Sequence, residues 1–570
     1  MRTINKTHKY VNLLCQHILS SRRYFLGLNS FAVLSCGQNT EVDNGQGGEL
    51  EVNVNAGNED EPTLFSYFPD DYAPPIDSSD QNIGTELFYN VHLTEYEEPY
   101  WVNALVMDQL DLHIEPVLNK YDRNIYFSFP EVQPDYDHFG LVGWKAATPE
   151  MKIAARIIFS QIEQILDVSF QETEKTEGFN NVSIARSKQS DTAGFSYLPN
   201  YAFEIGMDVF ISERFDKPGY VGGRVTNYDY EVILHEIGHA LGLKHPFESE
   251  GDNQVVLSDF EQKSNLTAMS YDENEIFYDG IFRPLDWLAL TKIYGVNETF
   301  NGEDNTYFFS DETAIFIIDG AGNDKIDASE HLKAVHVDLR QGSHSFIEQK
   351  SDFISSPNQL TVSHGSVIEN VETGPGDDIV IGNNEDNLII SGEGNDIIHA
   401  GEGSDAINPG IGLNEIDLSE EIQCTDTISI SNNTDLVNLN HIYLFEQGMS
   451  GDVIDLHEFN FGSLKILPIV SRSEVPECRI TNDVFRLFGR ELDTASKLKH
   501  AISSDEEFGS MEFVENSQSI IVTANSQSAG ETQNLFYVAN FDGELNISNI
   551  ATFYGAKMDL DMWHLDNFII

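Results

Sequence analysis

The stretch His235-Glu236-Ile237-Gly238-His239-Ala240-Leu241-Gly242-Leu243-Lys244-His245-Pro246 decides how the rest of the chain is interpreted. His235 and His239 are four residues apart, so on a helix both imidazoles leave the same face and can bind one metal ion. Gly242 permits the turn that ends the helix, so that His245 can supply a third nitrogen. Three nitrogens leave a fourth position open for water, which is typical of catalytic zinc sites, and Glu236 would take a proton from that water.

Two histidines on a helix also occur without a metal, and a bare His-Glu-x-x-His pattern is weak evidence. The longer pattern, with a glycine and a third histidine in register, is far more specific. Apolar residues recur at steps of three and four through the stretch, which predicts a helix with one buried face: Tyr230, Ile233, Leu234, Ile237, Ala240 and Leu241. We therefore favour a metal site over a structural histidine pair.

The composition indicates a globular protein with an unusually acidic charge. The chain has 570 residues, of which 40% are hydrophobic and 11% aromatic, enough for two to four domains with sizeable cores. Its 32 Lys+Arg against 94 Asp+Glu give a net charge of -62. This excess argues against a nucleic-acid partner, because phosphates would be repelled, and it favours divalent cations, calcium first among them.

The cysteines are too few and too scattered for a disulfide scaffold or a zinc ribbon; they are Cys15, Cys36, Cys424 and Cys478. Cys424 and Cys478 would pair in an oxidising compartment, although free thiols are the simpler expectation.

Residues 1–36 resemble an export signal. Ser21–Leu26 is similar to a twin-arginine signal, and the apolar run after it is too short to cross a membrane. The run ends at Val33–Cys36, which resembles a lipoprotein cleavage site with Cys36 as the lipid carrier; a frayed N-terminal helix is the alternative. Residues 37–120 predict an acidic tether and a pro-region.

Residues 121–300 predict an α+β domain. Alternation over Asn124–Pro130 predicts a strand, and Thr148-Pro149 opens a helix whose apolar face continues to Ile165. Short strands follow before the histidine helix. Among them, Ala193–Tyr197 predicts an exposed edge strand, which can bind an extended peptide by accepting it as a further strand.

A second motif, Thr267-Ala268-Met269-Ser270-Tyr271, places its methionine 24 residues beyond His245. Together the two motifs resemble the metzincin zinc proteases, in which a methionine turn lies beneath the metal, and they look most like the serralysin branch. Pro284–Gly295 resembles the last helix of the same catalytic domain.

The resemblance implies a role for each motif residue. Zinc would be bound by His235, His239 and His245, and Met269 would form the floor of the site. Glu236 would be the general base, and Tyr271 would contact the zinc or the developing oxyanion. The implied function is a secreted zinc-dependent endopeptidase that hydrolyses protein substrates with a zinc-activated water.

Five nine-residue units run from Thr373 to Asp417, and their sixth positions are Asp378, Asn387, Asp396, Asp405 and Asn414. This is the period of the calcium-binding parallel β-roll of repeats-in-toxin proteins, in which glycines form tight turns and aliphatic residues fill a core. We therefore expect calcium at Asp378, Asp396 and Asp405, with weaker binding in the second and fifth units. An isolated earlier unit ends at Asp324, which we also expect to bind calcium. A solvated acidic loop is the alternative, but it would not hold this spacing.

Residues 421–570 contain short alternating stretches that predict a β-rich domain. The terminus Asp566–Ile570 resembles the uncleaved type I secretion signal of serralysins. This conflicts with the export signal at the N-terminus, because serralysins that leave by the type I route lack a cleaved signal.

The expected fold class is thus an α+β metzincin catalytic domain, a parallel β-roll over 301–420 and a β-rich C-terminal domain. The expected cofactors are Zn²⁺ and Ca²⁺, and the partners are protein or peptide substrates, with no nucleic acid. We expect an extracellular monomer, with lipid anchoring at the cell surface through Cys36 as the alternative. Two other functions stay open: a calcium-dependent adhesion protein with a vestigial protease domain, and a zinc hydrolase with a non-peptide substrate.

Overall fold

The computed structural model describes residues 99–569, and every described residue belongs to one compact unit that includes Pro99–Ile570. Within that range the description leaves out residues 109, 136–140, 177, 190–191, 200–205, 216–219, 222–223, 226–227, 273–279, 433–438, 448–450, 460, 462–469, 472–477, 481–483, 489–491, 504–510, 525–531, 542–543, 556–562 and 564–566. The predicted export signal, Cys36 and the tether up to residue 98 lie outside the described residues.

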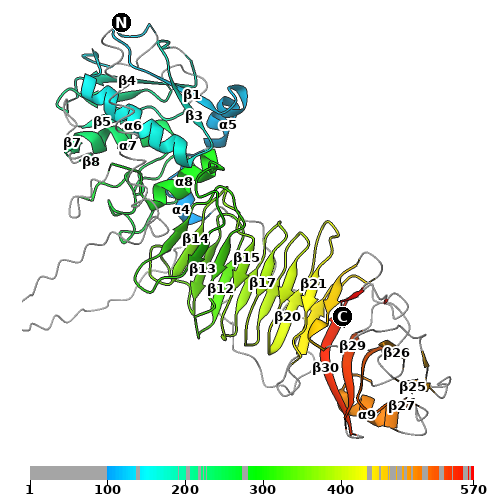
Figure 1. Cartoon of the computed structure of the whole chain (residues 1–570). Coiled ribbons are helices and arrows are strands. Elements are labelled where there is room, and N and C mark those ends of the chain that lie inside the picture. The colour runs from blue at the N-terminus through cyan, green and yellow to red at the C-terminus, as the bar shows by residue number, and fades with distance from the viewer. Residues whose placement is uncertain are drawn as a thin grey trace, which may run out of the picture. The chain divides into compact units, whose positions relative to one another are not determined.

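A six-stranded sheet forms the first layer of the N-terminal half (Figure 1). Its order is β3-β1-β4-β6-β5, with β2 paired to β4. The pairs β1–β3, β1–β4 and β4–β6 are parallel, whereas β5 and β2 run antiparallel to their neighbours. The strands are β1 (Asn124–Ser128), β2 (Lys145–Ala146), β3 (Ser169–Glu172), β4 (Asn181–Ser187), β5 (Gly194–Ser196) and β6 (Val209–Ser212); β7 (Tyr220–Val221) and β8 (Arg224–Val225) form a separate hairpin.

Helices cover this sheet as the apolar periodicity predicts. The hydroxyl of Thr148 accepts a hydrogen bond from the Met151 amide at 3.2 Å and caps α6 (Pro149–Ile165). Helix α6 packs against α7 (Tyr228–Ala240), which carries the first two motif histidines, and α7 also contacts β5 and β6. Helix α8 (Pro284–Tyr294) ends at Gly295 as predicted.

The hydrophobic core of this half extends to residues before 121. Helices α4 (Tyr100–Asn103) and α5 (Leu110–Lys120) precede the first strand. Trp101, Leu105 and Leu118 are buried in the same core as the residues of α6 to α8. The apolar residues show no clear period here, and Pro116 interrupts the helical pattern of α5. The segment from 99 to 120, predicted as part of a pro-region, therefore packs with the histidine-bearing half.

Two sheets form the predicted roll, and in Figure 1 their strands follow one another side by side from β12 to β21. The first sheet has eight parallel strands in the order β31 (Phe568–Ile569), β23 (Val453–Asp455), β21 (Thr427–Ser429), β19 (Ala406–Asn408), β17 (Leu388–Ile390), β15 (Asn370–Glu372), β11 (Lys325–Asp327) and β9 (Thr306–Phe308). The second begins β10 (Ile315–Ile317), β14 (Gln359–Val362), β13 (His344–Ile347), β12 (Val335–Asp338), β16 (Ile379–Ile381), β18 (Ile397–His399), β20 (Leu413–Asp417) and β22 (Leu439–Tyr443).

The middle residue of each short strand fills the space between the two sheets. In the first sheet Ile326, Val371, Ile389, Ile407, Ile428 and Ile454 lie in register on successive strands and are buried. Val380, Ile398, Ile416 and Ile442 do the same in the second sheet. One nonapeptide therefore adds one strand and one core residue, which confirms the predicted parallel roll.

The region beyond residue 421 is β-rich, as predicted, and it continues the second sheet of the roll. Strand β22 pairs in parallel with β30 (Glu544–Tyr554), and the sheet goes on through β29 (Gln533–Phe541), β28 (Ser517–Ala524), β26 (Val484–Phe488) and β24 (Val470–Ser471). Helix α9 (Ala495–Ser503), a 3₁₀ turn at His457–Phe459 and the pair β25 (Cys478–Ile480) with β27 (Met511–Phe513) complete it. Cys424 carries a free thiol.

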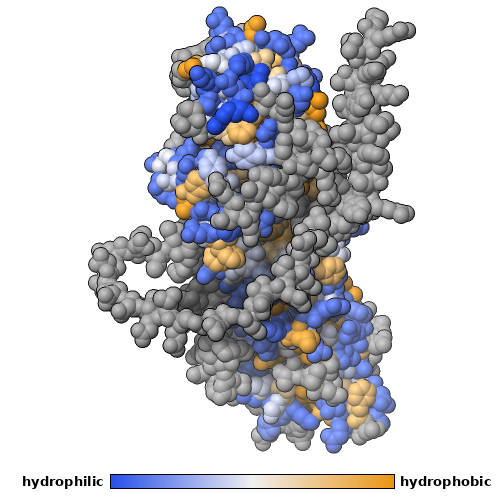
Figure 2. Space-filling model, turned by 90° about the vertical axis from the view of Figure 1, so that its left-hand side faces the viewer, coloured by the Kyte–Doolittle hydropathy of each residue, from blue (hydrophilic) through white to orange (hydrophobic). Residues whose placement is uncertain are grey.

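The surface agrees with the acidic composition. On the face that Figure 2 presents, hydrophilic residues cover most of the described surface, and hydrophobic ones are scattered. No helix among the described residues combines the length and the apolar character needed to cross a membrane.

Candidate metal centres

Helix α7 ends in a turn that returns the chain to its own histidines. The Leu243 amide donates to the Gly238 carbonyl oxygen at 3.0 Å, which is the long bond of a Schellman turn. Gly242 has φ of +103°, a backbone conformation that strains any residue with a Cβ atom. The sequence prediction that this glycine stops the helix and brings back His245 is confirmed.

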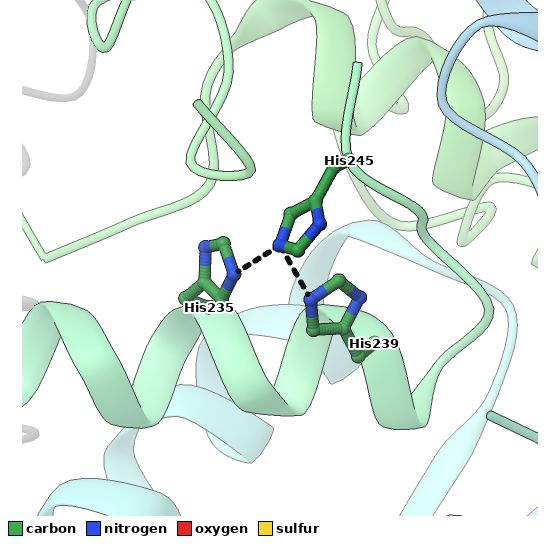
Figure 3. A group of neighbouring side chains, drawn as sticks. All are labelled: His235, His239 and His245. Carbon is green, nitrogen blue, oxygen red and sulfur yellow. Dashed lines mark hydrogen bonds between the residues drawn. The ribbon is translucent and has the colours of Figure 1, made fainter. Parts of the chain in front are cut away.

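The three histidine side chains converge through their Nε2 atoms (Figure 3). Nε2 of His245 lies 3.2 Å from Nε2 of His235 and 3.2 Å from Nε2 of His239. Among the described residues this is the one group of three or more potential metal ligands whose donor atoms all lie within 4.8 Å of one another. His235 and His239 leave the same face of α7, and His245 approaches from the turn.

Each histidine uses its other nitrogen to bind an oxygen. Nδ1–H of His235 donates to the Ala268 carbonyl at 2.9 Å, and that of His239 donates to the Leu243 carbonyl at 2.8 Å. Nδ1–H of His245 donates to Oε2 of Glu248 at 2.9 Å. Because carbonyl and carboxylate oxygens accept only, the proton of each neutral ring is on Nδ1 and the Nε2 lone pairs face one another. Three facing lone pairs are stabilised by a cation, and neutral imidazoles suit zinc.

Burial keeps the helical pair neutral. Desolvation lowers the pKa of His239 to about 4, and it lowers the pKa of His235 well below its usual range. Both rings are therefore ready metal ligands at neutral pH, since no proton has to leave them first.

Glu236 lies beside the histidines and does not bind to any of them. Its side chain is buried, and its Oε2 has no hydrogen-bond partner in the described part of the chain. Burial raises the pKa of this carboxyl to about 8. A Cβ atom on Gly194 of the edge strand β5 would lie 2.6 Å from Oε1 of Glu236, so the absence of a side chain there leaves the carboxyl its space.

The predicted methionine turn lies under the histidines. Met269 is fully buried, and its sulfur would be 2.8 Å from a Cβ atom on Gly238 of α7. Asp286 of α8 holds the turn: its carboxylate accepts from the Thr267 hydroxyl at 2.6 Å and from the Ala268 amide at 2.7 Å. Since the Ala268 carbonyl accepts from His235, the turn also orients that ring.

Tyr271 points its hydroxyl at the same centre. Its oxygen lies 2.8 Å from Nε2 of His245 and donates a hydrogen bond to it. Burial raises the pKa of the phenol to about 12, so the hydroxyl keeps its proton at neutral pH. The residue is still 61% exposed, which leaves it within reach of a bound molecule.

Sequence reasoning missed three residues of this centre: Gly194, Glu248 and Asp286. Glu248 lies only three residues after His245, and this spacing could have indicated a carboxylate that hydrogen-bonds to the histidine and orients it. Gly194 and Asp286 are far from the motif along the chain, and only the packing of β5 and α8 brings them close.

The roll aspartates form ladders along its two edges. On one edge the Asp378 amide donates to Oδ1 of Asp396 at 2.9 Å, and the Val335 amide donates to Oδ1 of Asp378 at 2.7 Å. On the other edge the Asn387 amide donates to Oδ1 of Asp405 at 2.8 Å. Each carboxylate thus ties its own coil to the preceding one.

The second oxygen of each predicted calcium ligand is buried and has no hydrogen-bond partner within the described residues. This holds for Oδ2 of Asp324, Asp378, Asp396 and Asp405. A buried carboxylate oxygen without a donor is costly, and a calcium ion, which binds oxygen alone, removes that cost. Asn387 and Asn414 occupy the same ladder positions with neutral amides.

Replacing Glu248 by Gln tests the orientation of the third histidine. The amide is a weaker acceptor for Nδ1–H, so His245 should become a poorer ligand and zinc affinity should fall by roughly 10-fold. Competition with a chromophoric chelator measures the affinity. The exposed Glu298→Gln variant is the control and should bind zinc as the parent does. Equal affinity in both variants would contradict the role of Glu248.

Removing calcium should make the roll sensitive to pH. Desolvation raises the pKa of Asp378 to about 6 and those of Asp396 and Asp405 to about 7, from a usual value near 4. A carboxyl whose pKa is raised by folding stabilises the fold below the unfolded pKa, and this contribution is lost as pH rises through the folded value. The calcium-free roll should therefore melt at a lower temperature at pH 7.5 than at pH 5.

Circular dichroism of the chelator-treated protein measures this melting. The Asp396→Asn variant removes one of the titrating groups and should flatten the pH dependence, and saturating calcium should abolish it. A calcium-free roll that is equally stable at both pH values would contradict this account.

Comparison with known proteins matches the repeats to a family and the chain to several curated relatives. Residues 372–407 match the RTX calcium-binding nonapeptide repeat, in four copies. The chain is 29% identical over 281 residues to metallopeptidase AprA of Pseudomonas marginalis, which covers 43% of this chain and 56% of that protein. It is 29% identical over 300 residues to serralysin of Proteus mirabilis and 28% over 289 residues to serralysin of a Photorhabdus species.

The matches to these two serralysins cover 46% and 45% of this chain and 60% and 57% of the relatives. The chain therefore spans less than two thirds of the curated relatives that it matches. Over these parts the chain is similar to serralysins, and its residues 372–407 match the RTX calcium-binding nonapeptide repeat.

Proposed function

We propose that the protein is a secreted zinc endopeptidase whose roll binds calcium. The observation that carries the proposal is the arrangement of His235, His239 and His245, with three Nε2 atoms turned inward and three Nδ1 protons tied to oxygen acceptors. The names of the serralysin and metallopeptidase relatives support the same reaction class.

Zinc bound there would polarise the scissile carbonyl and lower the pKa of a water molecule. Glu236 would take the proton of the attacking water and return it to the leaving amine. Its carboxyl has a pKa of about 8 without metal, and a neighbouring cation would favour the ionised form that a base requires. Because its Oε2 has no other partner among the described residues, that oxygen is available to the water.

An extended peptide fits the edge of the sheet beside this carboxyl. Strand β5 is the last strand in the order β3-β1-β4-β6-β5, so one of its edges is unpaired among the described strands. A substrate that pairs with Gly194–Ser196 would pass next to Glu236, since Gly194 contacts that side chain. This geometry favours a peptide over a compact non-peptide substrate.

Tyr271 would stabilise the oxyanion that forms when water attacks. Its hydroxyl is protonated, exposed and directed at the histidines. A metal bound to the Nε2 atoms would take the lone pair of His245 that accepts from Tyr271, and the hydroxyl would then be able to donate to substrate oxygen.

Calcium would fold the roll outside the cell. The facing carboxylates repel one another without a cation, so a low-calcium interior would keep the roll loose and a calcium-rich exterior would order it. We further propose that the chain is exported through its N-terminal or its C-terminal signal, that Cys36 carries lipid and that the protein is a monomer. Mass spectrometry of both mature termini tests the export signal and the lipid, and size-exclusion chromatography tests the monomeric state.

Replacing Glu236 by Ala should lower casein cleavage by about 10²-fold to 10⁴-fold while the protein still binds one zinc. The measurement pairs a casein assay with metal analysis of the same sample. Glu150→Gln, an exposed substitution on α6, is the control and should be fully active. Unchanged turnover in Glu236→Ala would contradict the proposed base. An inactive parent with bound zinc would favour the adhesion function.

Replacing Tyr271 by Phe should lower kcat by about 10²-fold to 10³-fold, with little change in KM or zinc content. The ring packing on His235 and Phe247 is kept by phenylalanine, so only the donor is removed. Loss of zinc from this variant would instead indicate a structural role for the hydroxyl.

A further inference from the structure

One aspartate beyond the nonapeptides continues the ladder of the second roll edge. Oδ1 of Asp426 accepts the amide of Asp405 at 2.9 Å, and the Asp426 amide donates to Oδ1 of Asp452 at 3.0 Å. These bonds repeat the pattern that joins Asn387 to Asp405. The spacing is irregular, 21 residues and then 26, so no repeat pattern marks Asp426. It also lies outside the matched residues 372–407.

Asp426 differs from the next aspartate of the ladder in one respect. Both oxygens of Asp452 accept backbone amides, those of Asp426 and Glu446. Asp426 is fully buried, and its Oδ2 has no hydrogen-bond partner in the part of the chain that the structure describes. Both carboxylate oxygens of Asp452, the last aspartate of the ladder, are therefore hydrogen-bonded, whereas one oxygen of Asp426 has no donor among the described residues.

Other acids surround this oxygen. The Glu420 carboxyl lies within hydrogen-bonding reach of Asp426, and its Oε2 accepts the Cys424 amide at 2.7 Å. Oδ2 of Asp405, on the preceding coil, is also buried without a partner among the described residues. Desolvation, followed by the charges of Asp452, Asp405 and Glu420, raises the pKa of Asp426 to about 9. Two carboxyl groups in contact share either a proton or a cation.

The coils that form this cluster contain no lysine or arginine of their own. None occurs between Lys350 and Lys465, a stretch that includes every coil from Asn370 to Asp455. A cation from solution is then the remaining neutralising charge besides a proton.

We infer that the turn 418–426 binds a calcium ion against the turn 400–405, through the carboxylates of Glu420 and Asp426. The donors are all oxygen, which selects a hard cation. No three carboxylates meet within 4.8 Å among the described residues, so these two would be the acidic ligands, and carbonyl oxygens or waters would complete the six to eight that calcium takes. The site has neither the glycines nor the spacing of a nonapeptide.

The test counts tightly bound calcium in the full chain, with zinc present, by elemental analysis after removal of free metal. Glu420→Gln and Asp426→Asn should each bind one calcium fewer than the parent. Glu421→Gln changes the exposed neighbouring acid and should bind the parental number. An unchanged count in Glu420→Gln would overturn the site and would mean that the Glu420–Asp426 pair holds a proton.

Hydrogen exchange supplies a local readout in the same proteins. Calcium should slow exchange of the amides in 418–426 in the parent and in Glu421→Gln, but not in Glu420→Gln, whose side chain is partly exposed and whose substitution leaves the core intact. Asp396→Asn removes a calcium ligand on the opposite edge, inside the nonapeptides. If only Asp396→Asn loses calcium, the nonapeptides bind calcium and the turn 418–426 does not. If only Glu420→Gln loses calcium, the inference stands and Asp396 is not a calcium ligand.

Discussion

Buried lone pairs that face one another with too few hydrogen-bond donors among the described residues are the constraint on which this structure depends. In the N-terminal half they are the three Nε2 atoms of the histidine cluster, which face one another because each Nδ1 proton is bound to an oxygen; of these three, Nε2 of His245 accepts from the Tyr271 hydroxyl. In the roll they are the Oδ2 atoms of Asp378, Asp396, Asp405 and Asp426, whose Oδ1 atoms are already bound to backbone amides. Both sets are held by hydrogen bonds on one side and require a cation on the other.

The chemistry of the donors separates the two cations. Imidazole nitrogens suit zinc, whereas carboxylate and carbonyl oxygens suit calcium. The architecture follows from the same division: a helix and a Schellman turn can direct three nitrogens to one point, whereas a parallel roll brings one oxygen from each coil to an edge. The net charge of -62 suits a chain that carries calcium-binding repeats.

Much of this could be predicted from the sequence, because the informative patterns are local. Helix α6, helix α7, its glycine stop and the roll strands all follow from periodicities of three to nine residues. Asp286, Gly194 and Asp426 could not be predicted, since each acts through a contact with a segment distant in sequence. Residues 99–120 were missed for a related reason: their apolar residues pack on elements that come later, and a proline breaks the helical period.

X-ray absorption at the zinc edge, on the zinc-loaded full chain, tests the central claim most directly. The account predicts a single zinc with three nitrogen ligands at about 2.0–2.1 Å and at least one oxygen ligand from water. The three histidine variants, each changed to Ala, should each lose this spectrum. A zinc held by four protein ligands, or one that persists when His245 is removed, would contradict a hydrolytic centre at this position.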